Sequence, residues 1–84
     1  MSWTVEVQRP AEKELAALPL QARERVASAL RAMEDDPFPH GDKKLKARDG
    51  YRVRVGDYRI LFTVNRAARL VRVGAIGHRK DVYR

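Results

Sequence analysis

Hydrophobic and polar residues alternate along four stretches of the chain, which predicts four β-strands. The first stretch is residues 2–7, where Trp3, Val5 and Val7 share one side. The other three lie in the second half of the chain and read YRVRV (51–55), YRILFTV (58–64) and RLVRVGAI (69–76). A period of two is typical of strands that bury one face.

Two stretches between the first strand and the others have helical spacing. Pro10 suits the first turn of a helix, where Glu12 and Glu14 also favour the partly positive N-terminus. Pro19 ends this helix and can begin the next, which prolines at 37 and 39 and Gly41 bring to an end. The apolar stripes that we expect in the core are Ala11, Leu15 and Leu18, then Ala22, Val26, Ala29, Leu30 and Met33.

The predicted order is β-α-α-β-β-β, an α+β fold in one domain over residues 1–84. We expect the two N-terminal helices to pack on one face of a small, mainly antiparallel sheet. The strand residues predicted for this core face are Tyr51, Val53, Val55, Tyr58, Ile60, Phe62, Val64, Val71, Val73 and Ala75. The opposite face, predicted to be open, carries Arg52, Arg54, Arg59, Leu61, Thr63 and Arg72.

The open face contains a conflict of charge. Gly56 and Asp57 predict a two-residue hairpin turn, which places Arg54 directly opposite Arg59. Arg52 lies two residues along on the same face. Like charges opposite each other across two strands are destabilising. Because local conflicts of this kind often mark functional sites, we predict that an anion binds between the three arginines.

The net charge of +7 is concentrated in the second half of the chain. Residues 1–42 hold five basic and eight acidic side chains, whereas residues 43–84 hold thirteen basic and three acidic ones. A strongly basic region indicates a polyanionic partner, most often nucleic acid, although a solvated basic surface has the same composition. A basic loop contains Lys43, Lys44, Lys46 and Arg48. We expect these side chains to bind RNA backbone; the alternative is that they are only solvated.

Several classes of protein are not supported by the sequence. There is no cysteine, and two histidines with scattered acids form no metal-ligand set, so we expect neither a metal nor a cofactor. No glycine-rich phosphate loop or serine nucleophile motif is present. The N-terminus lacks a signal-peptide pattern, and no apolar run approaches the roughly 20 residues that span a bilayer. We therefore expect a cytoplasmic protein without a membrane partner.

The C-terminal tail GHRKDVYR adds reactive side chains, although each could also serve only packing or solubility. Strict alternation from Val73 directs Arg79 toward the core face. A β-bulge at Gly74 or Gly77 would redirect it to the open face, since glycine often marks such kinks.

The segment KLKARDGYRVRVGDYRILFTV, followed by VGAIGHRKDVYR, resembles the RelE branch of the RelE/ParE toxin superfamily. The element order and the length also match, so the resemblance covers nearly the whole chain. It implies a toxin that enters the ribosomal A site and cuts mRNA without a metal. It also implies an antitoxin, encoded in an adjacent gene, which we expect to be acidic. The active-site positions of the family fall on Arg52, Arg54, Arg59, Arg79 and Tyr83.

The chemistry that the resemblance implies is attack of a ribose 2′-OH on the adjacent phosphate. Negative charge builds on the phosphoryl oxygens, and cations aimed at that charge are usually a large term in catalysis. We assign this role to Arg59 and Arg79. The bound anion would then be the scissile phosphate.

The sequence offers two candidates for the general base. The best-known enzymes of the family have lysine at one or both of the positions filled here by Arg52 and Arg54, and arginine does not lose its proton. The role then falls to Tyr83, a phenol whose pKa is ordinarily near 10 and which neighbouring arginines would lower. His78 is the reserve candidate.

Two other functions stay open. The sister ParE branch inhibits DNA gyrase by binding, but it generally lacks the full set of arginines with a tyrosine. A catalytically weak module that binds only RNA or its antitoxin is also consistent, because Arg52 and Arg54 weaken the case for a base.

Overall fold

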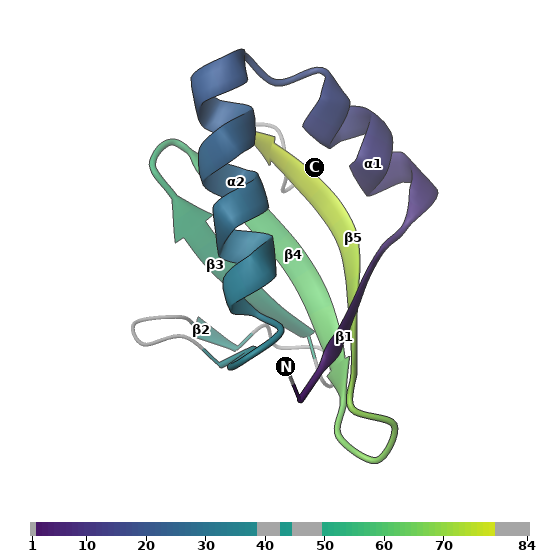
Figure 1. Ribbon diagram of the computed structural model, residues 1–84. Coiled ribbons are helices and arrows are strands. Elements are labelled where there is room, and N and C mark those ends of the chain that lie inside the picture. The colour runs from purple at the N-terminus through teal and green to yellow at the C-terminus, as the bar shows by residue number, and fades with distance from the viewer. Residues whose placement is uncertain (1, 39–42, 45–49, 79–84) are drawn as a thin grey trace.

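The structure is a computed structural model that describes residues 2–38, 43–44 and 50–78. Its elements follow the predicted order, with one addition (Figure 1). They are β1 (Thr4–Val7), α1 (Arg9–Ala16), α2 (Leu20–Ala32), β2 (Lys43–Lys44), β3 (Gly50–Val55), β4 (Tyr58–Asn65) and β5 (Leu70–His78).

The strands form one sheet in the order β1-β5-β4-β3-β2. β1 runs parallel to β5, and all other neighbours are antiparallel. Both helices lie on the same side of the sheet (Figure 1). The predicted α+β fold, with helices on one face of a mainly antiparallel sheet, is confirmed. Neither α1 nor α2 is long and apolar enough to cross a membrane.

The short strand β2 was not predicted. It occupies the start of the segment expected to be a basic loop, where Lys43 pairs with Arg52 and Lys44 with Tyr51. Two residues cannot display an alternating pattern, so only pairing with β3 defines this strand.

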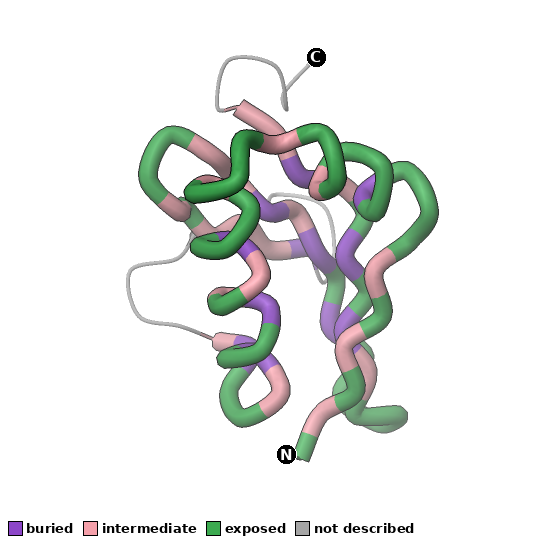
Figure 2. The backbone as a smooth tube through the Cα atoms, turned by 45° about the horizontal axis from the view of Figure 1, so that its top comes forward, coloured by how far each residue is buried: buried purple, intermediate pink, exposed green. Residues whose placement is uncertain are grey.

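The core lies between the helices and the sheet (Figure 2). Its buried apolar residues are Ala11, Val26, Leu30, Met33, Ile60, Phe62, Val64, Val71, Val73 and Ile76. Most were predicted. Leu15, Leu18 and Ala29 are only partly buried, at the margin of this core.

The prediction that Ala75 lies in the core was wrong. The register between β4 and β5 shifts between Leu61, which pairs with Ala75, and Phe62, which pairs with Val73. Gly74 is therefore an extra residue, and this β-bulge reverses the alternation beyond it. Ile76 becomes the fully buried residue instead. Of the two bulge positions considered from the sequence, the structure selects Gly74.

Candidate functional site

Three arginines gather on the face of the sheet that the helices leave open. The β3–β4 register pairs Arg54 directly with Arg59, and Arg52 with Leu61. Gly56 in the connecting turn has a positive φ of 61°, as expected for a two-residue hairpin. The Cβ atoms of directly paired residues are typically about 5 Å apart. We call Arg52, Arg54 and Arg59 the arginine face.

The three side chains differ in their surroundings. Arg54 is exposed, and its Nε donates a 3.3 Å hydrogen bond to the Gly56 carbonyl oxygen. Arg52 and Arg59 are half-buried, and each also interacts elsewhere in the chain. The Nε atom of Arg59 is shielded from solvent. The arginine face therefore combines one exposed side chain with two half-buried ones.

Small residues border the arginine face on β5. Gly77 pairs with Arg59, and Ala75 pairs with Leu61. Neither side chain is large enough to cover the neighbouring guanidiniums.

Arg72 lies on the same side of the sheet, but its charge is already matched. Its Nε is 3.3 Å from Glu6 Oε1, and both side chains are about half exposed. Arg72 is therefore not counted with the arginine face.

The tail residues are only partly placed. His78 ends β5 and pairs with Tyr58, and the two rings meet edge to face with centroids 5.8 Å apart. Since Tyr58 shares its parity with buried Ile60, His78 lies on the side of the sheet that faces the helices, away from Arg59. The bulge considered upstream of Arg79 occurs at Gly74, and the face on which Arg79 lies stays a prediction. The remaining predicted residues that lie outside the described ones are Arg79, Tyr83, Lys46 and Arg48, and for Lys43 and Lys44 only the backbone pairing is described.

A carboxylate from α1 holds β5 just before the tail begins. β1 pairs with β5 only as far as Val73. Beyond that point the buried Ile76 donates its backbone N–H to Glu14 Oε1 at 2.8 Å. Leaving such a donor unsatisfied costs about 1–3 kcal/mol. From the sequence, Glu14 was expected only to favour the helix N-terminus, and its contact with a residue 62 positions away carries no local signal.

A second pair of arginines lies in the β4–β5 turn, at the opposite end of β4 from the Arg54–Arg59 pair, and the sequence pattern did not predict it. Four aromatic rings form a chain here, with centroid distances of 5.8 Å for Trp3–Phe38, 5.5 Å for Phe38–Tyr51 and 5.8 Å for Tyr51–Phe62. The guanidinium carbon of Arg66 is 4.5 Å from the Phe38 centroid, and that of Arg69 is 5.7 Å from the Trp3 centroid. We call Arg66 and Arg69 the turn arginines.

Hydrogen bonds hold the backbone of the β4–β5 turn in place. Asn65 Oδ1 accepts a 3.0 Å hydrogen bond from the Ala68 N–H. The Arg69 carbonyl oxygen accepts a 2.9 Å bond from the Thr4 N–H, which ties the turn to β1. Arg69 also has a φ of 53°, a left-handed conformation that costs a non-glycine residue roughly 1–2 kcal/mol.

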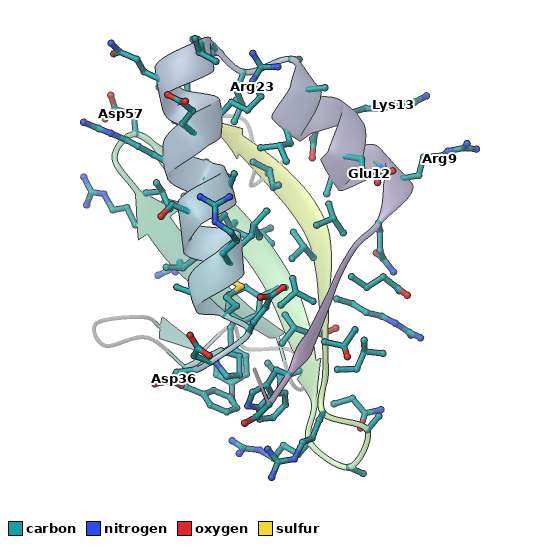
Figure 3. The ribbon with its side chains drawn as sticks, in the orientation of Figure 1. Arg9, Glu12, Lys13, Arg23, Asp36 and Asp57 are labelled. Carbon is teal, nitrogen blue, oxygen red and sulfur yellow. The ribbon has the colours of Figure 1, made fainter. Side chains whose placement is uncertain are left out.

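A shallow hollow of about 250 Å³ adjoins the β3–β4 turn, lined by Pro19, Gln21, Ala22, Arg25, Asp57 and Tyr58. Asp57 stands at the tip of this turn (Figure 3). The hollow contains one cation and one carboxylate, so it does not extend the positive charge of the arginine face.

Comparisons with known proteins agree with this geometry. The sequence model of the family described as "ParE toxin of type II toxin-antitoxin system, parDE" matches residues 5–83. A search of curated proteins gave no match.

Solved structures of RelE proteins share the fold. RelE in the archaeal RelE–RelB complex from Pyrococcus horikoshii is 26% identical, with a TM-score of 0.87 over 98% of this chain and 100% of the other. The RelB–RelE complex from Methanococcus jannaschii gives 26% identity and a TM-score of 0.77, over 93% and 94% of the two chains. The isolated E. coli RelE toxin is 23% identical, with a TM-score of 0.79 over 90% of this chain and 83% of the other. The chain therefore belongs to the RelE/ParE superfamily of type II toxin–antitoxin toxins, in its RelE-like branch.

Proposed function

We propose that this toxin is a ribosome-dependent endoribonuclease that cuts mRNA in the ribosomal A site and so stops translation. The observation that carries the proposal is the direct pairing of Arg54 with Arg59 on the open face, with Arg52 beside them. A phosphate between these guanidiniums converts their repulsion into attraction, and the guanidinium fork can bind two phosphate oxygens at once.

The proposed reaction is an internal transfer at one phosphate. The ribose 2′-oxygen loses its proton and bonds to phosphorus, and the bond from phosphorus to the 5′-oxygen of the next nucleotide breaks. Arg59, and Arg79 from the tail, stabilise the charge that builds on the phosphoryl oxygens. Arg52 and Arg54 bind the phosphate and keep the attack in line. The leaving 5′-oxygen takes a proton from solvent water, so the products are a 2′,3′-cyclic phosphate and a 5′-hydroxyl.

Tyr83 is the proposed general base, since arginines cannot accept a proton. His78, the reserve candidate, faces Tyr58 on the helix side of the sheet, so its position does not favour that role. The basic residues Lys43, Lys44, Lys46 and Arg48 are proposed to bind ribosomal RNA backbone. The place of action is then the cytoplasm.

Primer extension on mRNA during induced expression tests the proposal. We expect cuts in phase with codons, confined to translated regions, and their loss with Arg59→Ala. Growth arrest with intact mRNA would contradict the proposal.

A cognate antitoxin is the proposed partner, because the RelE relatives from Pyrococcus horikoshii and Methanococcus jannaschii were solved as complexes with RelB. An acidic chain would also neutralise the basic second half. Co-expression with the neighbouring small gene should yield a complex on affinity purification and restore growth. Toxin recovered alone, with growth still arrested, would argue against this partner.

The alternative function is inhibition of DNA gyrase, which is favoured by the ParE name of the matching family. A supercoiling assay with purified gyrase separates the two functions. Inhibition by the toxin, combined with intact mRNA in primer extension, would favour gyrase as the target.

A further inference from the structure

We propose that the turn arginines, Arg66 and Arg69, form a second RNA-binding site that binds phosphate groups outside the cleaved strand. The inference deepens the proposed function, since it assumes that RNA surrounds the toxin where it acts. None of the residues predicted from the sequence belongs to this site.

The first argument is the way in which the guanidiniums are held. Arg66 lies over Phe38 and Arg69 over Trp3, at 4.5 and 5.7 Å from the ring centroids. A guanidinium over a ring uses its face for the aromatic contact and keeps the N–H donors at its edge for an anion. Both arginines are exposed, so these donors can reach a ligand.

The second argument is charge. The rings of Trp3 and Phe38 meet edge to face with centroids 5.8 Å apart, so the two guanidiniums lie over neighbouring rings. Within the described residues, neither guanidinium forms an ion pair with an acid. The Asp36 carboxylate, two residues before Phe38, accepts a 2.9 Å hydrogen bond from the Phe38 N–H. Both guanidiniums therefore keep N–H donors for an external anion.

The third argument is preorganisation. The turn is braced by Asn65 and joined to β1 through Thr4, and Arg69 is kept in a left-handed conformation. The fold thus orders the two arginines before any ligand arrives, which lowers the entropy that binding must overcome.

RNA suits this site better than an acidic protein segment. Trp3 and Phe38 are only partly buried, and aromatic surface beside guanidiniums lets bases stack next to bound phosphates. Arg66 lies seven positions after Arg59, which corresponds to roughly 23 Å of extended strand between the two sites. Beside β3, the strand β2 pairs Lys43 with Arg52 and Lys44 with Tyr51, and Tyr51 contacts Phe38.

Trp3 reports directly on the site because it is the only tryptophan of the chain. We expect a 12-nucleotide 2′-O-methyl oligouridylate, which cannot be cleaved by 2′-OH attack, to change Trp3 emission in a saturable way. Arg66→Gln/Arg69→Gln should weaken this binding about tenfold or more, and should lower the slope of log affinity against log salt by about 1.4, the value for two contacts to a single strand. The response should persist in Arg54→Ala/Arg59→Ala, which lacks the core of the arginine face.

Arg9→Gln/Arg23→Gln is the matched control, since it removes the same charge from two exposed helix residues. Both residues lie on the helices, far from the β4–β5 turn (Figure 3). The control should bind within about twofold of wild type. Arg66→Lys/Arg69→Lys keeps the charge but lacks the planar fork, and should bind with intermediate affinity. Thermal unfolding of each variant verifies that the fold is intact. If Arg66→Gln/Arg69→Gln does not fold, the affinity of Arg66→Lys/Arg69→Lys tests the proposal instead.

Equal losses in the turn variant and the control would overturn the proposal, because only total charge would then matter. A Trp3 response to poly-glutamate of the same charge, with none to the oligouridylate, would assign the site to an acidic protein and would also overturn it. Intact mRNA in primer extension, with a normal Trp3 titration, would reject the proposed endonuclease while leaving this site in place.

Discussion

Two pairs of arginines lie at opposite ends of β4, and they are built differently. Arg54 and Arg59 face each other across adjacent strands, so the backbone register alone brings their charges together. Arg66 and Arg69 stand on rings contributed by Phe38 and Trp3, from distant parts of the chain. The first pair places two like charges directly opposite each other, whereas aromatic contacts stabilise each arginine of the second pair. We infer that the first pair binds the phosphate that reacts and that the second pair binds RNA phosphates that do not react.

The largest expected effect is on the rate of mRNA cleavage at the arginine face. Tyr83→Phe should lower single-turnover cleavage of mRNA in programmed ribosomes by about 10²–10⁴-fold, because it removes the proposed base and keeps the ring. His78→Gln should cost far less, since His78 packs on Tyr58. The wild-type rate should rise with pH, as the base must lose a proton. If Tyr83→Phe cleaves at the wild-type rate, the Tyr83 hydroxyl is not the base and its ring serves to stack on a nucleotide. If His78→Gln instead loses most of the cleavage rate, His78 is the base.

The next effect compares the two pairs directly. Arg59→Ala should lower the rate at saturating toxin by about 10²–10³-fold, as for other groups that stabilise transition-state charge. Arg66→Gln/Arg69→Gln should instead raise the toxin concentration needed for half-maximal rate, with the saturated rate within about threefold of wild type. If both variants lower the saturated rate equally, the assignment of Arg59 to catalysis and of the turn arginines to RNA binding is wrong.

Stability should respond only slightly to the loss of Arg54. Arg54→Ala relieves the repulsion with Arg59, which favours a gain of at most about 1 kcal/mol. The exposed hydrogen bond from Arg54 Nε to the Gly56 oxygen offsets part of that gain. Urea denaturation should therefore show a free energy of unfolding that is unchanged or slightly higher. A drop of more than about 1 kcal/mol would mean that Arg54 is structural, which would weaken the anion-site interpretation.

The smallest expected effect tests the turn arginines. Arg69→Gly relieves a left-handed conformation worth roughly 1–2 kcal/mol. It also removes a cation–π contact of about 0.5–1 kcal/mol and adds unfolded-state entropy worth about 0.5–1 kcal/mol. These contributions nearly cancel, so urea denaturation should detect little change. Arg66→Ala loses its ring contact without such relief and should be destabilised by about 0.5–1 kcal/mol. The opposite order would show that Trp3 holds Arg69 more firmly than Phe38 holds Arg66.

Local patterns in the sequence were sufficient for the element order, the β3–β4 hairpin and the pairing of Arg54 with Arg59. Turn residues and alternation act over a few positions, so a register built on Gly56 and Asp57 can be predicted without tertiary contacts. The arginine face therefore follows from a short stretch of sequence alone.

Tertiary structure alone decided the features that depend on distant partners. The sequence offered Gly74 and Gly77 as bulge positions, and core packing chose Gly74, because that choice buries Ile76 instead of Ala75. The carboxylate of Glu14 reaches Ile76 because the pairing of β1 with β5 stops at Val73 and leaves the Ile76 N–H to α1.

The turn arginines are the clearest case of a feature that the sequence alone does not predict. Nothing near Arg66 and Arg69 in the sequence predicts their role, since the rings beneath them belong to Trp3 and Phe38. Those rings arrive through the parallel pairing of β1 with β5 and through the segment that follows α2. Periodicity reports which face of an element is buried, but not which distant side chain comes to lie on it, because that depends on how the finished elements pack.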